Sequence, residues 1–253
     1  MKIKAVLFDL YGEINLQLLN FSNDNNGDVI ELPVEISVED FGKKYLKKQR
    51  KVSDIKIHSE PMTGTINGMW ANALGKGGII PIETRFYPAG AFLELKLTGM
   101  QGDVMKESMT VAKTLAWSLT PEDKQKELTK HFEETKNQGL HVHCPEGAVS
   151  KDGPSAGGAI TLSIYSLLNN IPINNTISMT GETNLRGRIT AIGGLDTKIL
   201  GSMRAGVKKV LYPKENQEDF DDFLEKYKNV INLDEMSFHA VDTIQEAMKL
   251  VFD

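Results

Sequence analysis

Apolar residues recur along the first part of the chain with the spacing of a helix. Between residues 2 and 20 the steps are three or four, which predicts an amphipathic helix. The positions are Ile3, Leu7, Leu10, Ile14 and Leu18. Residues 21–27 form a polar stretch, and residues 28–58 are charged and have no sustained apolar period. We therefore interpret 1–55 as an appendage and 56–253 as the main domain.

Glycine-punctuated apolar segments follow from about Pro61. The segments 63–75, 78–87 and 92–99 each carry strand-forming residues between turn signals and predict strands. A run with one apolar face predicts a helix from Asp103 to Leu119, which Thr120-Pro121 ends. Residues 121–139 begin with proline and acidic side chains and predict a second helix.

The second half mixes both kinds of element. Residues 140–147 predict a strand that a glycine-rich turn joins to a helix of small residues near Ser155. Further strands are expected at 176–182 and 208–213, with a helix at 197–207 between them. The last fifteen or so residues predict a strand and then a helix. The fold class expected from this order is α+β.

Composition narrows the class of protein. The 253 residues carry a net charge of −5 and one cysteine, which favours a reducing compartment and disfavours nucleic acid as the main partner. We find neither a membrane-spanning run nor a signal-peptide cleavage site, so we expect a soluble, intracellular protein, in the cytoplasm or an organelle matrix. The basic run at 43–51 is interpreted as solvated surface.

The segment 151–157, KDGPSAG, has a pattern suited to a nucleophile. It predicts a turn that leads into a helix, whose unpaired N-terminal amides stabilise an oxyanion, and the small residues after Ser155 leave room for a substrate. A serine hydroxyl still needs an adjacent base. From these residues alone, the simpler interpretation of Ser155 is an N-cap serine beside a flexible turn.

Several blocks together resemble one family. KDGPSAG is similar to the serine motif of A-type Lon proteases, and residues 179–216, MTGETNLRGRITAIGGLDTKILGSMRAGVKKVLYPKEN, match the pattern downstream of it. LTGMQGDVMKES and HVHCPEG resemble upstream parts of the same domain, so the likeness covers most of 62–216. The resemblance implies the fold of a Lon proteolytic domain, with Ser155 as nucleophile and Lys198 as general base.

A lysine acts as a base only when it is neutral, so its pKa must fall from about 10.4. The residues around Lys198 are suited to this because they are largely apolar and would desolvate the amine. They are Ala191, Ile192, Leu195, Ile199 and Leu200.

The resemblance also implies supporting residues. Thr180 matches the threonine whose hydroxyl orients the lysine amine, although it is also read as an ordinary strand-end threonine. Asp152, with Gly153 and Pro154 before the serine, is implied to shape the turn and the oxyanion hole, or the aspartate engages the site in an inactive conformer.

Glu83 corresponds to a glutamate that the family has near the dyad. The stretch before it, ALGKGGIIPIE, departs from the usual pattern. We expect the departure to alter a substrate-binding edge strand or an access loop and to leave the dyad unchanged.

The implied activity is a serine endopeptidase acting on unfolded polypeptides that bind in extended form. The resemblance implies a homo-hexamer and an ATPase module in cis or in trans, and residues 2–20 are interpreted as a remnant of that module's last helix. No cofactor is expected in this chain, since ATP and magnesium belong to the ATPase. The rival hypothesis is an assembly or peptide-binding module that keeps the dyad but is catalytically silent.

Three other signals are discounted. His141, His143 and Cys144 have zinc-binding side chains, but a fourth ligand has no clear candidate. Gly75-Lys76 lacks the glycine and the Ser or Thr of a phosphate loop. Asp9 in AVLFDLYGE resembles the opening strand of haloacid-dehalogenase-like hydrolases, but Glu13 stands where that family expects Thr or Ser.

Overall fold

The computed structural model describes residues 56–72, 75–99, 102–145 and 153–252, together with two short strands near the N-terminus. The chain divides into two compact units, Met1–Ser53 and Asp54–Asp253. In the first, β1 (Leu7–Phe8) pairs antiparallel with β2 (Ile14–Asn15). The helix expected over 2–20 is therefore wrong at these positions, because their main-chain groups pair between two strands instead of along one helix. The remaining residues of 2–20 lie outside the described part.

The other interpretations of this region concern residues that lie outside the described part. They include Asp9, the basic run at 43–51 and the polar loop. The appendage boundary and the ATPase-remnant interpretation stay predictions.

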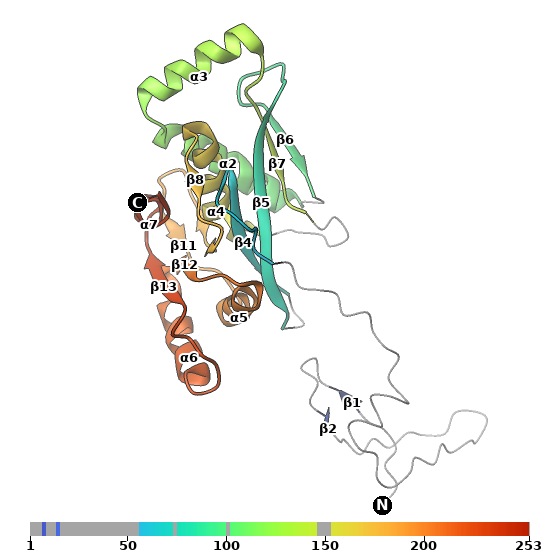
Figure 1. Ribbon diagram of the computed structural model, residues 1–253, viewed down its shortest axis with the longest axis vertical. Helices are drawn as coiled ribbons and strands as arrows, with labels where there is room; N and C mark the ends of the chain where they lie inside the picture. The colour runs from blue at the N-terminus through green and yellow to red at the C-terminus, as the bar shows by residue number, and fades with distance from the viewer. Residues whose placement is uncertain are drawn as a thin grey trace, which may run out of the picture. The chain divides into compact units, whose positions relative to one another are not determined.

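A mixed seven-stranded sheet is the frame of the second unit (Figure 1), with strand order β13-β12-β9-β4-β5-β7-β6. Neighbours from β13 to β4 are parallel, whereas β5 is antiparallel to both β4 and β7. The strands are β4 (Thr65–Ala71), β5 (Gly77–Tyr87), β6 (Leu95–Thr98), β7 (Gly139–His143), β9 (Ile177–Met179), β12 (Lys209–Pro213) and β13 (Ser237–Val241). Two smaller antiparallel pairs are β3 (Met62–Thr63) with β8 (Pro172–Ile173), and β10 (Glu182–Thr183) with β11 (Ile189–Thr190).

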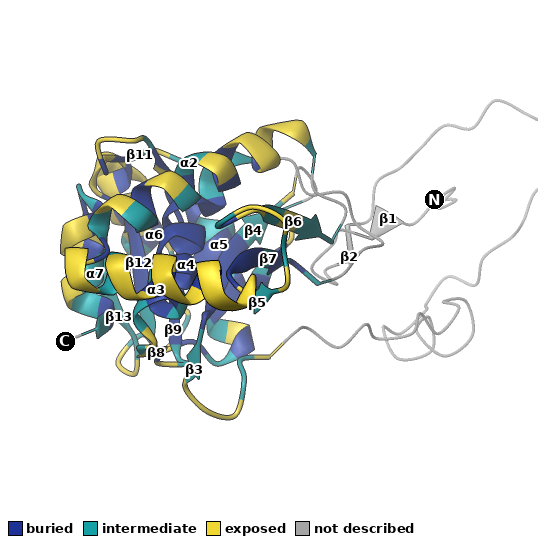
Figure 2. Ribbon diagram, turned by 90° about the horizontal axis from the view of Figure 1, so that it is seen from above, coloured by how far each residue is buried: buried dark blue, intermediate teal, exposed yellow. Residues whose placement is uncertain are grey.

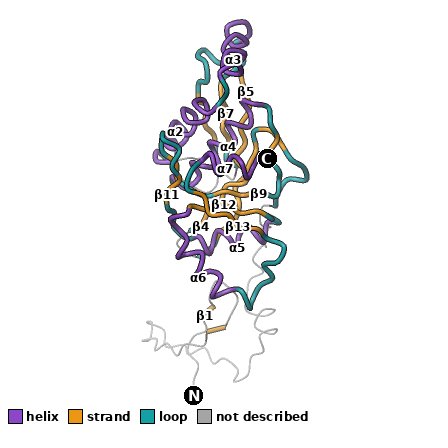
Figure 3. Tube along the Cα trace, turned by 90° about the vertical axis from the view of Figure 1, so that its left-hand side faces the viewer, coloured by secondary structure: helices purple, strands orange, loops and turns teal. Residues whose placement is uncertain are grey.

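Helices cover both faces of this sheet. Figure 3 shows α2, α4 and α7 on one side of β9, β12 and β13, and α5 and α6 on the other. The helices are α2 (Asp103–Leu119), α3 (Glu122–Thr135), α4 (Gly157–Asn169), α5 (Leu195–Ala205), α6 (Gln217–Tyr227) and α7 (Ile244–Phe252). Short 3-10 turns η1 (Pro154–Ala156) and η2 (Lys214–Asn216) precede α4 and α6. The expected α+β fold is confirmed.

Alternation along β5 fills two separate cores. Ile80 and Ile82 face the core shared with α2 and α4, while Ile79, the residue before them, faces the core shared with α5 and α6. Because successive strand side chains point to opposite faces, one strand supports both helical layers. Figure 2 shows α4 as largely dark blue in the interior and α3 as largely yellow on the surface.

Close packing of α5 depends on glycine. A Cβ at Gly201 would lie 2.3 Å from the carbonyl carbon of Gly77 and 2.3 Å from the amide nitrogen of Gly78. Real Cβ atoms do not approach backbone atoms this closely, so Gly201 lets α5 lie directly against the start of β5. This contact fixes the height at which α5 presents its side chains over the sheet.

Candidate active site

Ser155 lies in the turn that begins the buried helix α4. It stands in η1 between the extended Gly153 and the first residue of α4, and it is partly exposed together with Gly153 and Pro154. The turn therefore leaves the serine within reach of a substrate. Asp152 lies outside the described residues.

The two glycines after this turn face inward. A Cβ at Gly158 would lie 2.3 Å from Met179 Cε, and one at Gly157 would lie 3.0 Å from the amide nitrogen of Thr183. Both residues are buried. The expectation that these small residues admit a substrate is wrong at Gly157 and Gly158, because their size is needed for α4 to pack against β9 and β10.

Lys198 lies one turn into α5 with its side chain inside the protein. Only 4% of the residue is exposed, and its neighbours Leu195 and Ile199 belong to the core under α5. Burial lowers the pKa of its amine from 10.5 to about 8, because removing water disfavours the ammonium form. The apolar surroundings expected for this lysine are present, and its role as a base stays a prediction.

Thr180 connects the lysine with the serine. It follows β9, is fully buried, and accepts a hydrogen bond from Lys198 Nζ at 3.2 Å through Oγ1. The same hydroxyl donates to the main-chain oxygen of Ser155 at 3.2 Å. A hydroxyl has one hydrogen to donate, so these two bonds fix Thr180 as acceptor toward the amine and donor toward the serine backbone.

Main-chain bonds hold the serine turn to the segment that follows β9. The amide of Gly181 donates to the oxygen of Ser155 at 2.7 Å, and the amide of Gly158 donates to the oxygen of Gly181 at 2.9 Å. A continuous set of hydrogen bonds therefore joins three separate elements. Ser155 lies in η1, Thr180 follows β9, and Lys198 lies in α5.

Glu83 occupies a different position. It is partly exposed on β5, opposite Thr65 of β4 and His143 of β7. Within the ranges that the structure describes, no hydrogen bond or ion pair joins it to Ser155, Lys198 or Thr180. Its predicted proximity to the dyad stays a prediction.

The stretch of β5 before Glu83 pairs with β4 along Gly77–Glu83, whereas β7 pairs with β5 only over Glu83–Tyr87. Among the described strands, the residues before Glu83 are therefore paired on one side only, and the expected change to a substrate-binding edge strand stays a prediction. Gly77 and Gly78, which lie within the departing segment, make the close contact with α5. Residues 73–74, in the alternative access loop, lie outside the described residues.

The discounted zinc ligands are separated by the pleat of β7. His141 Nε2 and His143 Nδ1 lie 2.9 and 2.7 Å from the same hydroxyl, Thr98 Oγ1, while Cys144 is fully buried in the core on the other face. Among the described residues, no group of three or more His, Cys, Asp or Glu side chains could hold a metal ion.

Sequence reasoning did not single out Glu215 and Asn216, although they end the matched block as PKEN. Glu215 Oε2 accepts the amide hydrogen of Ala191, and Asn216 Oδ1 accepts that of Ile192, both at 2.9 Å. These two residues therefore hold the loop that leads to Lys198. Helix α6, which follows them, was also missed, although Phe220, Phe223 and Tyr227 have helical spacing.

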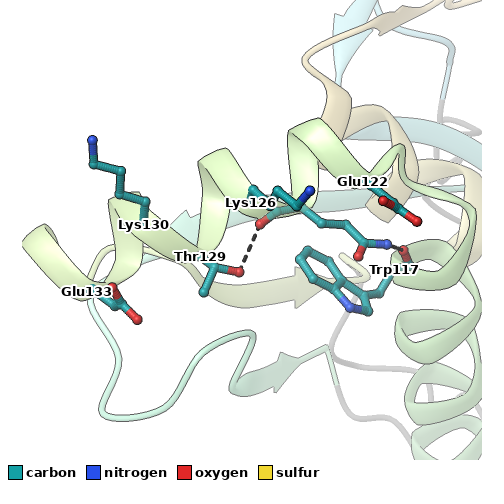
Figure 4. A pocket seen from close by; sticks show the side chains of 7 residues that line it. Trp117, Glu122, Lys126, Thr129, Lys130 and Glu133 are labelled. Carbon is teal, nitrogen blue, oxygen red and sulfur yellow. Dashed lines mark hydrogen bonds between the residues drawn. The ribbon is translucent and has the colours of Figure 1, made fainter.

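A shallow depression of about 460 Å³ lies elsewhere, beside α3 (Figure 4). Trp117 of α2 forms its floor, and Glu122, Lys126 and other side chains of α3 line the rest. None of the predicted site residues lines it. Figures 1 and 3 both show α3 at the end of the unit away from α5 and α6.

In the part of the chain that the structure describes, no helix is long and apolar enough to cross a membrane. Comparisons with known proteins show which proteins this chain is similar to. A "Lon protease" of Fervidobacterium nodosum is 37% identical over 203 residues, which cover 80% of this chain and 23% of the relative. A "Lon protease" of Wolbachia pipientis is 40% identical over 181 residues, covering 69% and 20%, and one of Neorickettsia sennetsu is 36% identical over 215, covering 85% and 24%.

The chain thus spans about a quarter or less of the length of these relatives. The family described as Lon protease (S16) C-terminal proteolytic domain matches residues 22–253, nearly the whole chain. The chain belongs to this family of Lon-type peptidase domains.

Proposed function

We propose that this domain is a serine endopeptidase in which Ser155 is the nucleophile and Lys198 the general base. Two hydrogen bonds carry the proposal. Lys198 Nζ donates to Thr180 Oγ1, and Thr180 Oγ1 donates to the main-chain oxygen of Ser155, both at 3.2 Å. They hold a buried amine at the turn that exposes the serine.

In the proposed reaction, Ser155 Oγ attacks the carbonyl carbon of the scissile peptide bond while neutral Lys198 takes the hydroxyl proton. The resulting ammonium gives its proton to the leaving amine, and an acyl-enzyme remains. Water, deprotonated by the same lysine, then attacks the ester and releases Ser155. Atoms and protons balance through one side chain that acts as base and then as acid.

The oxyanion of each tetrahedral intermediate needs donors that are not already engaged. The amide of Gly157 donates to the oxygen of Pro154, and that of Gly158 donates to Gly181. We therefore assign the oxyanion hole to amides of the turn Gly153–Ala156, excluding Pro154, which has no N–H.

The pKa of Lys198 suits this role. With a value of about 8, roughly a tenth of the amines are neutral at pH 7. An ordinary lysine with a pKa of about 10.4 would be neutral in fewer than about one molecule in a thousand. Burial thus raises the population of the reactive form by more than a hundredfold.

The natural substrates are proposed to be unfolded polypeptides, bound as extended strands through main-chain hydrogen bonds. Degradation of folded proteins is proposed to need an ATP-driven unfolding module, in cis or in trans, and the assembly is proposed to be a homo-hexamer. ATP and magnesium would serve that module.

A fluorogenic peptide assay tests the proposal. Turnover is expected in the unaltered chain and is expected to be lost in both Ser155→Ala and Lys198→Ala. Undiminished turnover in either variant would contradict the dyad. A folded chain with no turnover under any assembly state, and with unchanged peptide binding in both variants, would support the silent binding module instead.

A further inference from the structure

Two hydrogen bonds of the buried amide side chain of Asn216 hold the loop that precedes α5. Asn216 Nδ2 donates to the oxygen of Ile192 at 2.8 Å, and Asn216 Oδ1 accepts from the amide of Ile192 at 2.9 Å. Asn216 itself is only 3% exposed, so its side chain has little freedom to move. One side chain therefore satisfies both polar groups of a single loop residue and fixes its position.

The neighbouring side chain holds the neighbouring loop residue. Glu215 Oε2 accepts from the amide of Ala191 at 2.9 Å, and Glu215 Oε1 pairs with Arg188 Nη2 at 3.1 Å. Two consecutive residues of η2 thus bind two consecutive residues of the loop. Side-chain atoms of one segment thus bond to main-chain atoms of the other at two successive positions.

The position of this loop determines where Lys198 stands. Gly194, which ends the loop, has a φ of +68° and is the N-cap of α5. Its oxygen accepts the amide hydrogen of Lys198 at 3.0 Å, which is the first turn of the helix. Moving residues 191–194 would therefore move the start of α5 and the lysine with it.

The same segment also holds the lysine's partner. The oxygen of Leu211 in β12 accepts the amide hydrogen of Thr180 at 3.1 Å. Residues 211–216 thus bind Thr180 at one end and the loop before Lys198 at the other.

We propose that residues 211–216 form a positioning frame for the catalytic lysine, with Asn216 as its main positioning residue and Glu215 as its support. The inference rests on the proposed Ser155–Lys198 function and deepens it. Asn216 contacts no reacting atom. It acts by holding the first turn of α5 at the distance from β9 that lets Lys198 bond to Thr180.

Displacement of residues 211–216 would change a measurable property of Lys198, the pKa of its amine. The low pKa of Lys198 is caused by burial, and the charged side chains on the surrounding elements, Asp196, Glu182, Arg188 and Glu215, are at least partly exposed. Water that enters around a displaced lysine would stabilise the ammonium and raise the pKa toward its ordinary value. A purely structural role would reduce the folded population without this shift.

The first test is Asn216→Ala in the complete chain with a fluorogenic peptide. We expect kcat to fall on the order of tenfold to a hundredfold, because small displacements of a catalytic group are costly. KM should change little, and the rising limb of kcat against pH should move to higher pH by about one unit. The control is Asn67→Ala, because Asn67 is 2% exposed and also donates two hydrogen bonds to main-chain oxygens, those of Asn175 and Ile177. It should lower stability and leave the pH midpoint unchanged.

Glu215→Ala and Glu215→Gln give a second pair on the surface, where folding is not at risk. The glutamine keeps an acceptor for Ala191, so it should retain more of kcat and a smaller pH shift than the alanine. A fall in kcat at an unchanged pH midpoint in both Asn216→Ala and Glu215→Ala would overturn the proposal.

A readout without turnover separates this inference from the proposed function. In a chain labelled with ¹³C at lysine Cε, the resonance lost in Lys198→Ala reports the titration of Lys198 directly by NMR. It should move to higher pH in Asn216→Ala, and an unmoved titration would again contradict the frame. Retained turnover in Ser155→Ala or Lys198→Ala would instead contradict the proposed catalysis, and the NMR titration would still test whether the frame positions the lysine.

Discussion

The amine of Lys198 donates a hydrogen bond to Thr180 Oγ1 at 3.2 Å inside the protein, where both residues are almost fully buried. The bond holds the amine in one direction, while burial of the residue lowers its pKa. Thr180 in turn donates to the backbone of Ser155, so the threonine sets the lysine and the serine turn relative to each other.

Replacing Thr180 by valine tests this bond. Valine has nearly the same shape but no hydroxyl, so it removes the acceptor for Lys198 and the donor for Ser155. We expect kcat for a fluorogenic peptide to fall on the order of tenfold or more, with little change in KM. Thr180→Ser keeps the hydroxyl and should retain most of kcat. Equal activity in the valine and serine variants would show that the bond does not orient the base.

The rate should depend on pH through Lys198. The base must be neutral, and its pKa is about 8, so kcat should rise with pH and reach half of its upper value near pH 8. Below that point it should fall about tenfold per pH unit. Measured kcat values from pH 6 to 10 give the midpoint. A midpoint near the ordinary histidine pKa of about 6.5 would point to a different base.

Burial of Lys198 should cost stability in a pH-dependent way. The folded state lowers the pKa from 10.5 to about 8, so the unfolded chain binds the proton more tightly and stability rises as pH increases between these values. Below pH 8 the full penalty, about 3 kcal/mol, is present. Lys198→Met removes the amine and should raise the free energy of unfolding by up to this amount at pH 7.

Urea unfolding at pH 7 and at pH 10.5 measures this effect. The gain from Lys198→Met should be large at the lower pH and nearly vanish at the higher one. A gain that is the same at both values would trace to packing instead of to the buried amine.

The contact between α5 and β5 should tolerate no side chain at Gly201. Its Cβ would lie 2.3 Å from backbone atoms of Gly77 and Gly78, so Gly201→Ala must shift the helix. We expect a loss of about 1–3 kcal/mol in the free energy of unfolding, measured with urea. Gly90→Ala is the control, because its Cβ would meet nothing nearer than Glu94 Oε2 at 3.7 Å. Equal stability of the two variants would contradict the close packing.

The spacing of apolar residues predicted helices and strands best where a single spacing, helical or alternating, runs through the segment. The apolar face from Asp103 to Leu119 gave both ends of α2, and the alternation around Val142 gave β7. The same reasoning was wrong at Leu7–Phe8 and Ile14–Asn15, where pairing between two segments overrode the helical spacing. It missed α6, whose apolar face is hidden among acidic residues such as Asp221 and Asp222.

Within the site, the sequence indicated a serine in a turn before a helix and a lysine among apolar residues, because both features depend on neighbours along the chain. It did not reveal that Gly157 and Gly158 serve packing, since the atoms they avoid belong to Met179 and Thr183. It also did not reveal which strands β5 pairs with, because strand order is decided by pairings between distant segments.

The sequence by itself therefore determined the family, the α+β class and the identity of the proposed nucleophile and base. Only the tertiary structure decided how Lys198 is held and how far its pKa is lowered. Thr180 lies 18 positions before Lys198, and the Asn216 side chain reaches back 24 positions to Ile192. Such contacts follow from the sheet and its covering helices, and removal of water from around the amine is a property of the packed protein as a whole.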